Sequence, residues 1–322
     1  MERSPWLSPT GALLGPEFPL ALDEPFDRGA ARSAGVTDRQ LAQLVRDGLL
    51  RHVLTGVYAA SQAPDSVAER VRALRLVLPP NTVVADRTAG WLHGMPVLRR
   101  GAHLSVPPLD VATVTDTRVR RNGTDGRRRQ LSRSDVMDIG GVPVTTPLRT
   151  ACDLGRLLWR YDAIAAIDGA LARGVDRERL LAECARFKGF RGVRQLRALA
   201  PLGDFRSESP GESALRLRWL EAGLPTPVSQ HEILDDDGWA RYRLDLASPD
   251  VRYAAEYDGV EFHSHPADRD RDARRRSWLR DQARWTVDVF TKEDVFRAGT
   301  KIHERLWAGF CSARQCVGVW KP

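Results

Sequence analysis

The chain has 322 residues, enough for two domains that each bury a core, and its 49 Lys and Arg against 42 Asp and Glu give a net charge of +7. Most of the basic residues are arginines, which bind phosphate bidentately, so the excess fits a nucleic-acid partner, although a GC-rich genome also enriches arginine. Four scattered cysteines without a C-x-x-C pair exclude a disulfide framework and a zinc module. With no signal peptide and no run of ~18 apolar residues, we expect a cytoplasmic protein with no membrane partner.

The first elements expected along the chain form a small helical body with a β-wing. Residues 1–26 are rich in Pro and Gly without sustained periodicity, and we expect them to be loosely ordered. A short helix near residues 27–34, a helix over residues 38–47 and two extended segments within residues 49–58 follow. Helix, turn, helix and wing in this order predict a winged helix-turn-helix.

The second of these helices has a polar face that suits contacts with base edges. The residues of that face are Arg39, Gln40, Gln43 and Arg46, and the wing adds Arg51 for phosphate contacts. The same residues are also ordinary on a solvated helix, and many winged helices contact only proteins. Both DNA recognition and protein contact therefore stay open for this face.

The middle of the chain alternates helices with short extended segments. Helices are expected at residues 66–78, 87–93, 147–158, 161–173, 176–186 and 192–199, and extended segments at 81–85, 103–106, 116–121 and 142–145. An arginine-rich loop is expected around residues 122–126, either as a phosphate-binding patch or as a solvated loop. Residues 201–211 break the helical pattern, so we place a domain boundary near residue 205, between residues 27–204 and 205–322.

Beyond this boundary the pattern predicts an α/β module. The expected elements are a helix over residues 209–221, a strand before a turn at 235–238, strands over 242–247 and 251–257, a helix over 268–284, a strand over 286–290 and a helix over 294–310. This order, α-β-β-β-α-β-α, brings the acidic residues of the strands to one edge of a sheet. For the whole chain we expect an α/β fold with two domains.

Two acidic residues in the central strands predict a metal site. If the turn between these strands spans residues 248–251, Asp245 lies opposite Ala254 and diagonal to Glu256, which shares a face with Asp258. Carboxylates on a diagonal of ~7 Å repel each other unless a cation lies between them, and Mg²⁺ prefers such oxygen ligands. The alternative is a solvated outer face, which the apolar neighbours on both sides of the second strand disfavour.

Further residues could support this site. Glu212 follows Ser209 by three residues, so it either completes a capping box or supplies another acid beside the hairpin. His263 follows the second acidic strand and is either structural or a general base or phosphate contact. Arg271 and Arg275 of the charged helix either steer a phosphodiester backbone towards the acids or belong to a salt-bridged surface.

The C-terminal part resembles a known group of nucleases. Its motifs are Glu212-Ser213, Gly223-Leu-Pro225, Arg243-Leu-Asp-Leu-Ala247, and Glu256-Tyr-Asp-Gly259 followed by His263. They are similar to an uncharacterised bacterial family, related to the very-short-patch-repair mismatch endonuclease, within the restriction-endonuclease-like PD-(D/E)XK group. The resemblance spans residues 205–310 and implies an α/β/α core that cuts DNA with Mg²⁺ or Mn²⁺. It implies Asp245 and Glu256 as metal ligands, with Glu212 and His263 in support.

Two positions differ from the pattern of that group. The usual lysine two residues after the second acid is Asp258 here, so His263 or Lys292 would have to activate water or stabilise charge. The glycine that usually precedes the tryptophan near the last strand is replaced by Arg284, before Trp285. A module that binds DNA but no longer cuts it is therefore kept as an alternative.

The first half resembles the AbiEi-type antitoxin domain. Its marks are residues 51–58, Ala89-Gly-Trp-Leu-His-Gly94 and residues 144–153. The resemblance implies DNA binding and a link to toxin–antitoxin, phage-defence or repair systems, with a cognate toxin among the partners. Double-stranded DNA is the expected partner in two hypotheses: a metal-dependent endodeoxyribonuclease, or a non-enzymatic antitoxin-like transcriptional regulator with a degenerate nuclease domain.

Overall fold

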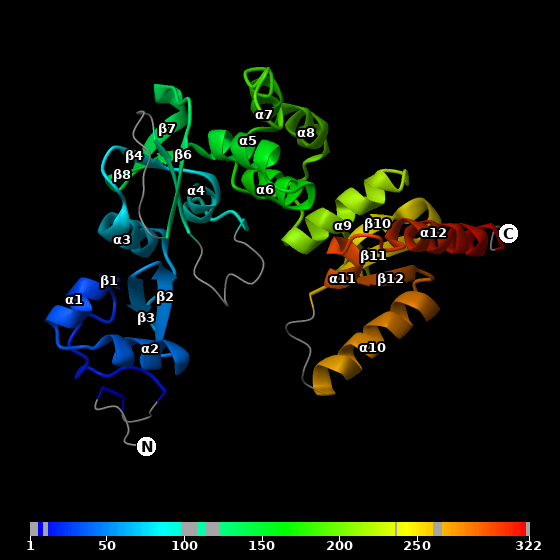
Figure 1. Cartoon of the computed structure of the whole chain (residues 1–322). Coiled ribbons are helices and arrows are strands. Elements are labelled where there is room, and N and C mark those ends of the chain that lie inside the picture. The colour runs from blue at the N-terminus through cyan, green and yellow to red at the C-terminus, as the bar shows by residue number, and fades with distance from the viewer. Residues whose placement is uncertain are drawn as a thin grey trace. The chain divides into compact units, whose positions relative to one another are not determined.

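The computed structural model of the protein describes residues 6–8, 12–97, 108–113, 123–235, 237–259 and 266–319. The chain divides into two compact units, residues 1–150 and 151–322, and each unit contains both helices and strands (Figure 1). The expected mixture of helices and sheets is therefore confirmed. The division falls inside helix α5 (Pro147–Leu157).

The first unit begins with two short helices and a small sheet. Its elements are β1 (Phe26–Asp27), α1 (Arg28–Ser33), α2 (Asp38–Arg46), β2 (Leu50–Leu54) and β3 (Val57–Ala60), and the strand order is β1-β3-β2. Thr37 caps α2, because its hydroxyl accepts the Gln40 N–H while the Gln40 side chain accepts the Thr37 N–H. Leu41 and Leu44 are buried on the opposite face of α2. Two helices followed by a two-stranded wing thus occur in the predicted order.

The segment before β1 packs against this small body. The side chains of Leu14 and Phe18 are 2% and 4% exposed, and the ring centroids of Phe18 and Phe26 lie 6.0 Å apart. The side chain of Gln62 donates a hydrogen bond to the Leu14 carbonyl at 3.0 Å. The expectation of a loosely ordered N-terminus is therefore wrong for residues 12–25, because apolar side chains anchor a segment that lacks helical or strand periodicity.

A five-stranded sheet forms the rest of the first unit. Its elements are α3 (Val67–Val77), β4 (Thr82–Val84), α4 (Asp86–Leu92), β5 (Leu109–Thr113), β6 (Thr124–Arg128), β7 (Val136–Ile139) and β8 (Val142–Thr145), with the strand order β6-β5-β4-β8-β7. The arginine-rich loop expected around residues 122–126 instead enters β6, which pairs with β5 in parallel. The extended segments expected at residues 103–106 and 116–121 lie outside the described residues.

The second unit begins with helices that precede the C-terminal sheet within the same compact unit. The elements are α5, α6 (Arg160–Ala172), α7 (Arg177–Glu183), α8 (Val193–Leu199) and α9 (Pro210–Glu221). Helix α6 packs against α9, where Arg216 Nη2 lies 2.6 Å from Asp168 Oδ2 in a buried ion pair. Asp168 also accepts the Asp204 N–H at 2.7 Å. The boundary predicted near residue 205 therefore falls inside one compact unit, since these contacts cross it.

The remaining elements form a four-stranded sheet between helices. They are β9 (Val228–Leu234), β10 (Ala240–Ser248), β11 (Tyr253–Asp258), α10 (Pro266–Asp281), β12 (Thr286–Thr291), α11 (Lys292–Phe296) and α12 (Ile302–Val319), with the strand order β12-β11-β10-β9. β11 and β12 are parallel, and the other neighbours are antiparallel. The predicted order of elements is found, except that the closing helix is split into α11 and α12 around Gly299, whose φ is +74°.

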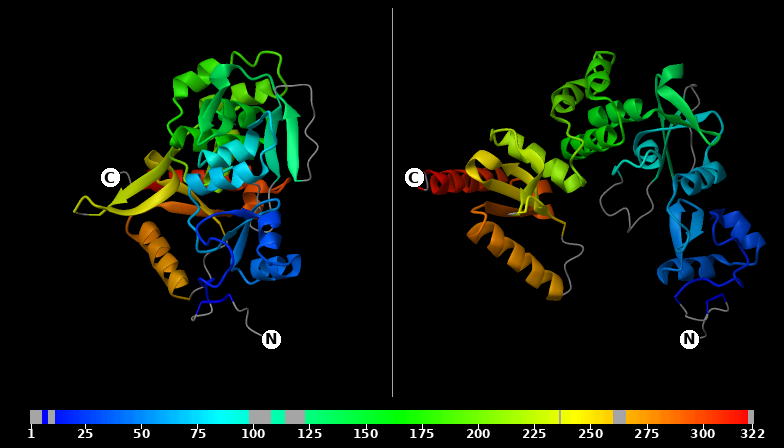
Figure 2. Two further views of the ribbon diagram at one scale, coloured as in Figure 1. Left: turned by 90° about the vertical axis from the view of Figure 1, so that its left-hand side faces the viewer. Right: turned by 180° about the vertical axis from the view of Figure 1, so that it is seen from behind.

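The two faces of this sheet are covered by different helices (Figure 2). On one face, the Tyr253 ring packs against Trp219 of α9 and Phe310 of α12. On the other face, Leu279 of α10 is buried with Ala247 and Ala254. This layering gives helix–sheet–helix packing in the second unit and places α10 beside the acidic strands.

The turn after α10 contains the position where arginine replaces the glycine expected from the sequence resemblance. Arg284 has a φ of +60°, a left-handed conformation that glycine adopts without strain and arginine does not. The following Trp285 N–H donates to the Leu279 carbonyl at 2.9 Å, which ties the turn after α10 back to the helix. The glycine usual at this position is thus the residue that the backbone favours.

We therefore expect Arg284→Gly to raise the free energy of unfolding by about 1 kcal/mol, because it relieves the left-handed strain. Arg284→Ala is the matched control, since it removes the same side chain but keeps a Cβ in the strained conformation. Urea denaturation of the three proteins measures the difference. Equal stability of the Gly and Ala variants would show that the backbone conformation of Arg284 costs nothing.

Candidate active site

The connection between β10 and β11 sets the register of the two acidic strands. Ser248 pairs with Tyr253 and Leu246 with Ala255, so four residues, 249–252, form the connection. It contains a 3-10 turn and ends at Arg252, whose φ is +53°. Sequence reasoning placed Asp245 opposite Ala254 with a two-residue loop. The longer loop shifts the pairing by two residues, and Asp245 therefore lies level with Glu256 instead of diagonal to it.

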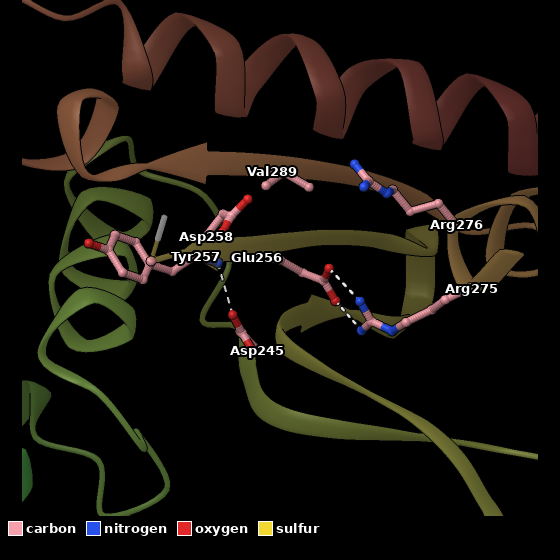
Figure 3. A pocket seen from close by; sticks show the side chains of 8 residues that line it. Asp245, Glu256, Tyr257, Asp258, Arg275, Arg276 and Val289 are labelled. Atoms are coloured by element: carbon pink, nitrogen blue, oxygen red, sulfur yellow. Dashed lines mark hydrogen bonds and ion pairs between the residues drawn. The ribbon is translucent and has the colours of Figure 1, made fainter. Parts of the chain in front are cut away.

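Asp245 is held by the backbone of the neighbouring strand. Its Oδ2 accepts the Tyr257 N–H at 2.8 Å (Figure 3). Burial, together with the negative charges of Glu212 and Glu256, raises the pKa of the Asp245 carboxyl to about 7, against the lowering effects of the Tyr257 hydrogen bond and the Arg275 charge. Three acids predicted from the sequence are therefore within electrostatic reach of one another.

Glu212 has contacts that fit both of its predicted roles in part. The hydroxyl of Ser209 accepts the Glu212 N–H at 3.1 Å and so caps α9. The Glu212 carboxylate, however, accepts the N–H of Glu208 at 2.9 Å and the side-chain amide of Gln230 at 2.7 Å. Burial raises the pKa of Glu212, and its charge acts on Asp245. Glu212 therefore lies at the start of α9 and also acts electrostatically on Asp245 in the neighbouring sheet.

Arg275 of α10 neutralises Glu256. Its Nη1 and Nη2 donate to the two carboxylate oxygens of Glu256 at 2.8 and 2.5 Å, as Figure 3 shows. Nη2 also donates to the Arg243 carbonyl at 2.8 Å. Glu256 is only 9% exposed, so this forked contact compensates a buried charge. Arg275 was predicted as a DNA contact, and in this structure it faces the acidic strands.

These residues line a cavity of about 230 Å³. Its lining consists of Asp245, Glu256, Tyr257, Asp258, Gly259, Arg275, Arg276 and Val289. Asp258 therefore belongs to the site, whereas His263 lies outside the described residues and nothing is described of the Arg271 side chain. Sequence reasoning did not single out Arg276 or Gln230. The run of arginines at positions 274–276 could have drawn attention to Arg276.

The donor set has the chemistry of a divalent cation site, with one obstacle. Asp245 and Glu256 offer hard carboxylate oxygens on adjacent strands, the ligand type that Mg²⁺ and Mn²⁺ prefer. Within the described ranges, no group of three or more His, Cys, Asp or Glu side chains is arranged to hold a metal ion. Both oxygens of Glu256 contact Arg275. A metal ion on Glu256 would therefore meet the Arg275 guanidinium at the same carboxylate.

The predicted DNA-reading face of α2 is exposed. Arg46 donates to the Gln43 side chain at 2.6 Å, and Gln43 donates to Asp47 at 2.7 Å. Gln40 is engaged with Thr37 in the helix cap.

Arg51 on the wing is tied to the fold. Its Nη2 donates to both oxygens of buried Glu69, at 2.6 and 2.5 Å, and to the Ala63 carbonyl at 3.2 Å. Since removing Arg51 would leave the Glu69 charge uncompensated, its guanidinium has a structural role.

Comparison with known proteins relates part of this chain to an antitoxin family. Residues 82–202 match the family model of the AbiEi antitoxin C-terminal domain, which confirms the AbiEi resemblance for that part of the chain. The chain also belongs to the family of two Mycobacterium tuberculosis proteins, Uncharacterized protein MT2308 (strain CDC 1551 / Oshkosh) and Uncharacterized protein Rv2248 (strain ATCC 25618 / H37Rv). It is 33% identical to each over 273 residues, which cover 84% of this chain and 96% of each relative. Among the described helices, none has the length and apolar character needed to cross a membrane.

The raised pKa of Asp245 predicts a pH-dependent effect of Asp245→Asn. The folded-state pKa of about 7 exceeds the unfolded value, so the stability of the wild type falls as pH rises from about 4 to about 7. Asparagine carries no charge and keeps an oxygen for the Tyr257 N–H. In EDTA we expect the variant to exceed the wild type in free energy of unfolding by about 2 kcal/mol at pH 8 and by little at pH 4.

Urea denaturation at both pH values measures this difference. Asp250→Asn, which removes an exposed carboxylate of the same hairpin, is the control. An advantage of Asp245→Asn that is the same at pH 4 and pH 8 would contradict the pKa assignment.

Proposed function

We propose that this protein binds double-stranded DNA and hydrolyses a phosphodiester bond with Mg²⁺ or Mn²⁺, in a toxin–antitoxin, phage-defence or repair context. The placement of Asp245 level with Glu256 at a cavity lined by two arginines carries this proposal. The AbiEi antitoxin domain supports the toxin–antitoxin context and DNA binding. A restriction-endonuclease-like core is the corresponding proposal for residues 205–322.

In the proposed site, the acidic residues of the cavity would bind the cation and an arginine would bind the phosphate. Asp245 and Glu256 would hold the ion, and the Tyr257 N–H orients one oxygen of Asp245. The chemistry that such an ion supplies when bound is activation of water and stabilisation of negative charge on the phosphate. Arg276 lines the same cavity, and its planar guanidinium suits a phosphate oxygen. Asp258 and Glu212 add negative charge that favours a divalent cation.

Nicking of supercoiled plasmid tests the proposed activity. We expect wild-type protein to nick DNA with Mg²⁺ or Mn²⁺ and not with EDTA, and Glu256→Gln to reduce the rate at least about a hundredfold, because a neutral amide is a poor ligand for a hard cation. Glu232→Gln, which changes an exposed carboxylate on β9, is expected to keep the wild-type rate. Nicking that survives Glu256→Gln would remove the assignment of this site.

A second function is favoured by the contact between Arg275 and Glu256. An arginine that contacts both carboxylate oxygens compensates the charge of Glu256 without metal. Together with the AbiEi domain, this supports a non-enzymatic regulator that binds DNA, and a cognate toxin, through a degenerate nuclease module. In that case α2 would read DNA and the acidic strands would be structural.

DNA binding in EDTA tests the role of α2 in either case. We expect the triple variant of Arg39, Gln43 and Arg46 to alanine to weaken duplex binding at least about tenfold, with a smaller salt dependence, since two phosphate-seeking charges are lost. The Arg179→Ala/Arg194→Ala variant removes the same charge from exposed positions in the second unit and is the control. Fluorescence anisotropy at several salt concentrations distinguishes them. Equal affinities of the two variants would exclude α2 as the reading helix.

A further inference from the structure

Arg275 is fixed at the place where a cation would neutralise the acidic strands. Its guanidinium donates two hydrogen bonds to Glu256 and one to the Arg243 carbonyl. It also lies 5.7 Å from the centroid of the Tyr242 ring. The side chains of Arg275 and Glu256 are 26% and 12% exposed, so the pair is shielded from solvent more than an ordinary surface ion pair. The ion pair of Arg275 and Glu256 is therefore an integral part of the cavity wall.

We propose that Arg275 is an internal cation that competes with the metal ion for Glu256, so that the site accepts metal when the guanidinium moves onto a DNA phosphate. The inference rests on the proposed metal-dependent function and describes the regulation of that same site. It makes Arg275 a positioning residue that couples metal binding to the presence of a phosphodiester.

The competition follows from charge and from hydrogen-bond geometry. A divalent ion on Glu256 would lie beside the positive guanidinium, and two such cations in a partly buried cavity repel each other strongly. Release of Arg275 from Glu256 leaves its planar donor fork available, and that fork matches phosphate oxygens as well as it matches a carboxylate. Arg276 lines the same cavity, so a phosphate there would meet two guanidinium groups. DNA and metal would then favour each other's binding.

Binding of Mn²⁺, followed by the electron paramagnetic resonance signal of the free ion, tests the competition without any measurement of cleavage. We expect Arg275→Gln to bind Mn²⁺ at least about tenfold more tightly than wild type, because the competing charge is gone. Arg274→Gln is the matched control: it removes the same charge from the same helix, at an exposed position that does not line the cavity. Its affinity should lie within about twofold of wild type.

The outcomes separate this inference from the proposed function. If wild type and Arg275→Gln bind Mn²⁺ equally, and Asp245→Asn abolishes binding in both, the metal site stands and the competition is overturned. If folded wild type and folded Arg275→Gln both fail to bind Mn²⁺, the metal-dependent function falls and the inference falls with it. Circular dichroism establishes folding, and Arg275→Lys, which keeps the charge but loses the fork, should bind Mn²⁺ less tightly than Arg275→Gln.

Duplex binding tests the transfer of Arg275 to phosphate. With EDTA, Arg275→Gln and Arg274→Gln should weaken the binding of a labelled duplex by similar factors, since Arg275 is then held by Glu256. With saturating Ca²⁺, which takes the same oxygen ligands, Arg275→Gln should weaken binding about tenfold more than Arg274→Gln. Equal losses in both conditions would overturn the transfer.

Discussion

Asp245 and Glu256 stand level with each other on adjacent strands of a sheet that helices cover on both faces, and their negative charges require compensation. The four-residue β10–β11 connection sets the register that brings the two carboxylates close together. The Tyr257 N–H donates to Asp245 and the Arg275 guanidinium donates to Glu256, and both contacts reduce the repulsion between the two acids. Helix α10 packs Leu279 on the sheet, and in this position its Arg275 contacts Glu256. The packing of α10 on the sheet therefore contributes both to the lining of the cavity and to its charge.

Two cations could compensate the acids of the proposed site, namely the Arg275 guanidinium and a divalent metal ion. Arg275 donates to both carboxylate oxygens of Glu256 without metal, whereas burial, with the charges of Glu212 and Glu256, keeps the pKa of Asp245 raised to about 7. The Arg275 charge lowers that pKa only in part, and a divalent ion would lower it further. The proposed nuclease and the proposed regulator thus differ in which cation occupies one position.

The segment that matches the AbiEi antitoxin family includes helices that pack against the acidic-sheet module. The AbiEi match over residues 82–202 includes strands of the first unit and helices α5 to α8 of the second, where α6 packs on α9. Helix α9 in turn carries Glu212, whose charge acts on Asp245. The antitoxin part and the acidic sheet therefore share a helical core, held by the buried pair of Arg216 and Asp168.

The sequence by itself determined the elements whose signals are local. Thr37 and Ser209 begin helices because their hydroxyls cap the next turn, and apolar runs mark β10, β11 and β12. Strand β6 was missed, because its Thr-Asp-Gly-Arg-Arg sequence has little β-propensity and depends on its parallel partner β5.

Only the tertiary structure decided what depends on contacts between distant residues. The register that brings Asp245 level with Glu256 depends on the conformation of the loop at Arg252, which the turn residues did not specify. Likewise, the sequence predicted Arg275 as a phosphate contact or as part of a salt-bridged surface, and only the packing of α10 placed it on Glu256. Capping and periodicity act over a few residues, whereas charge compensation and strand register depend on the packing of segments far apart in the chain.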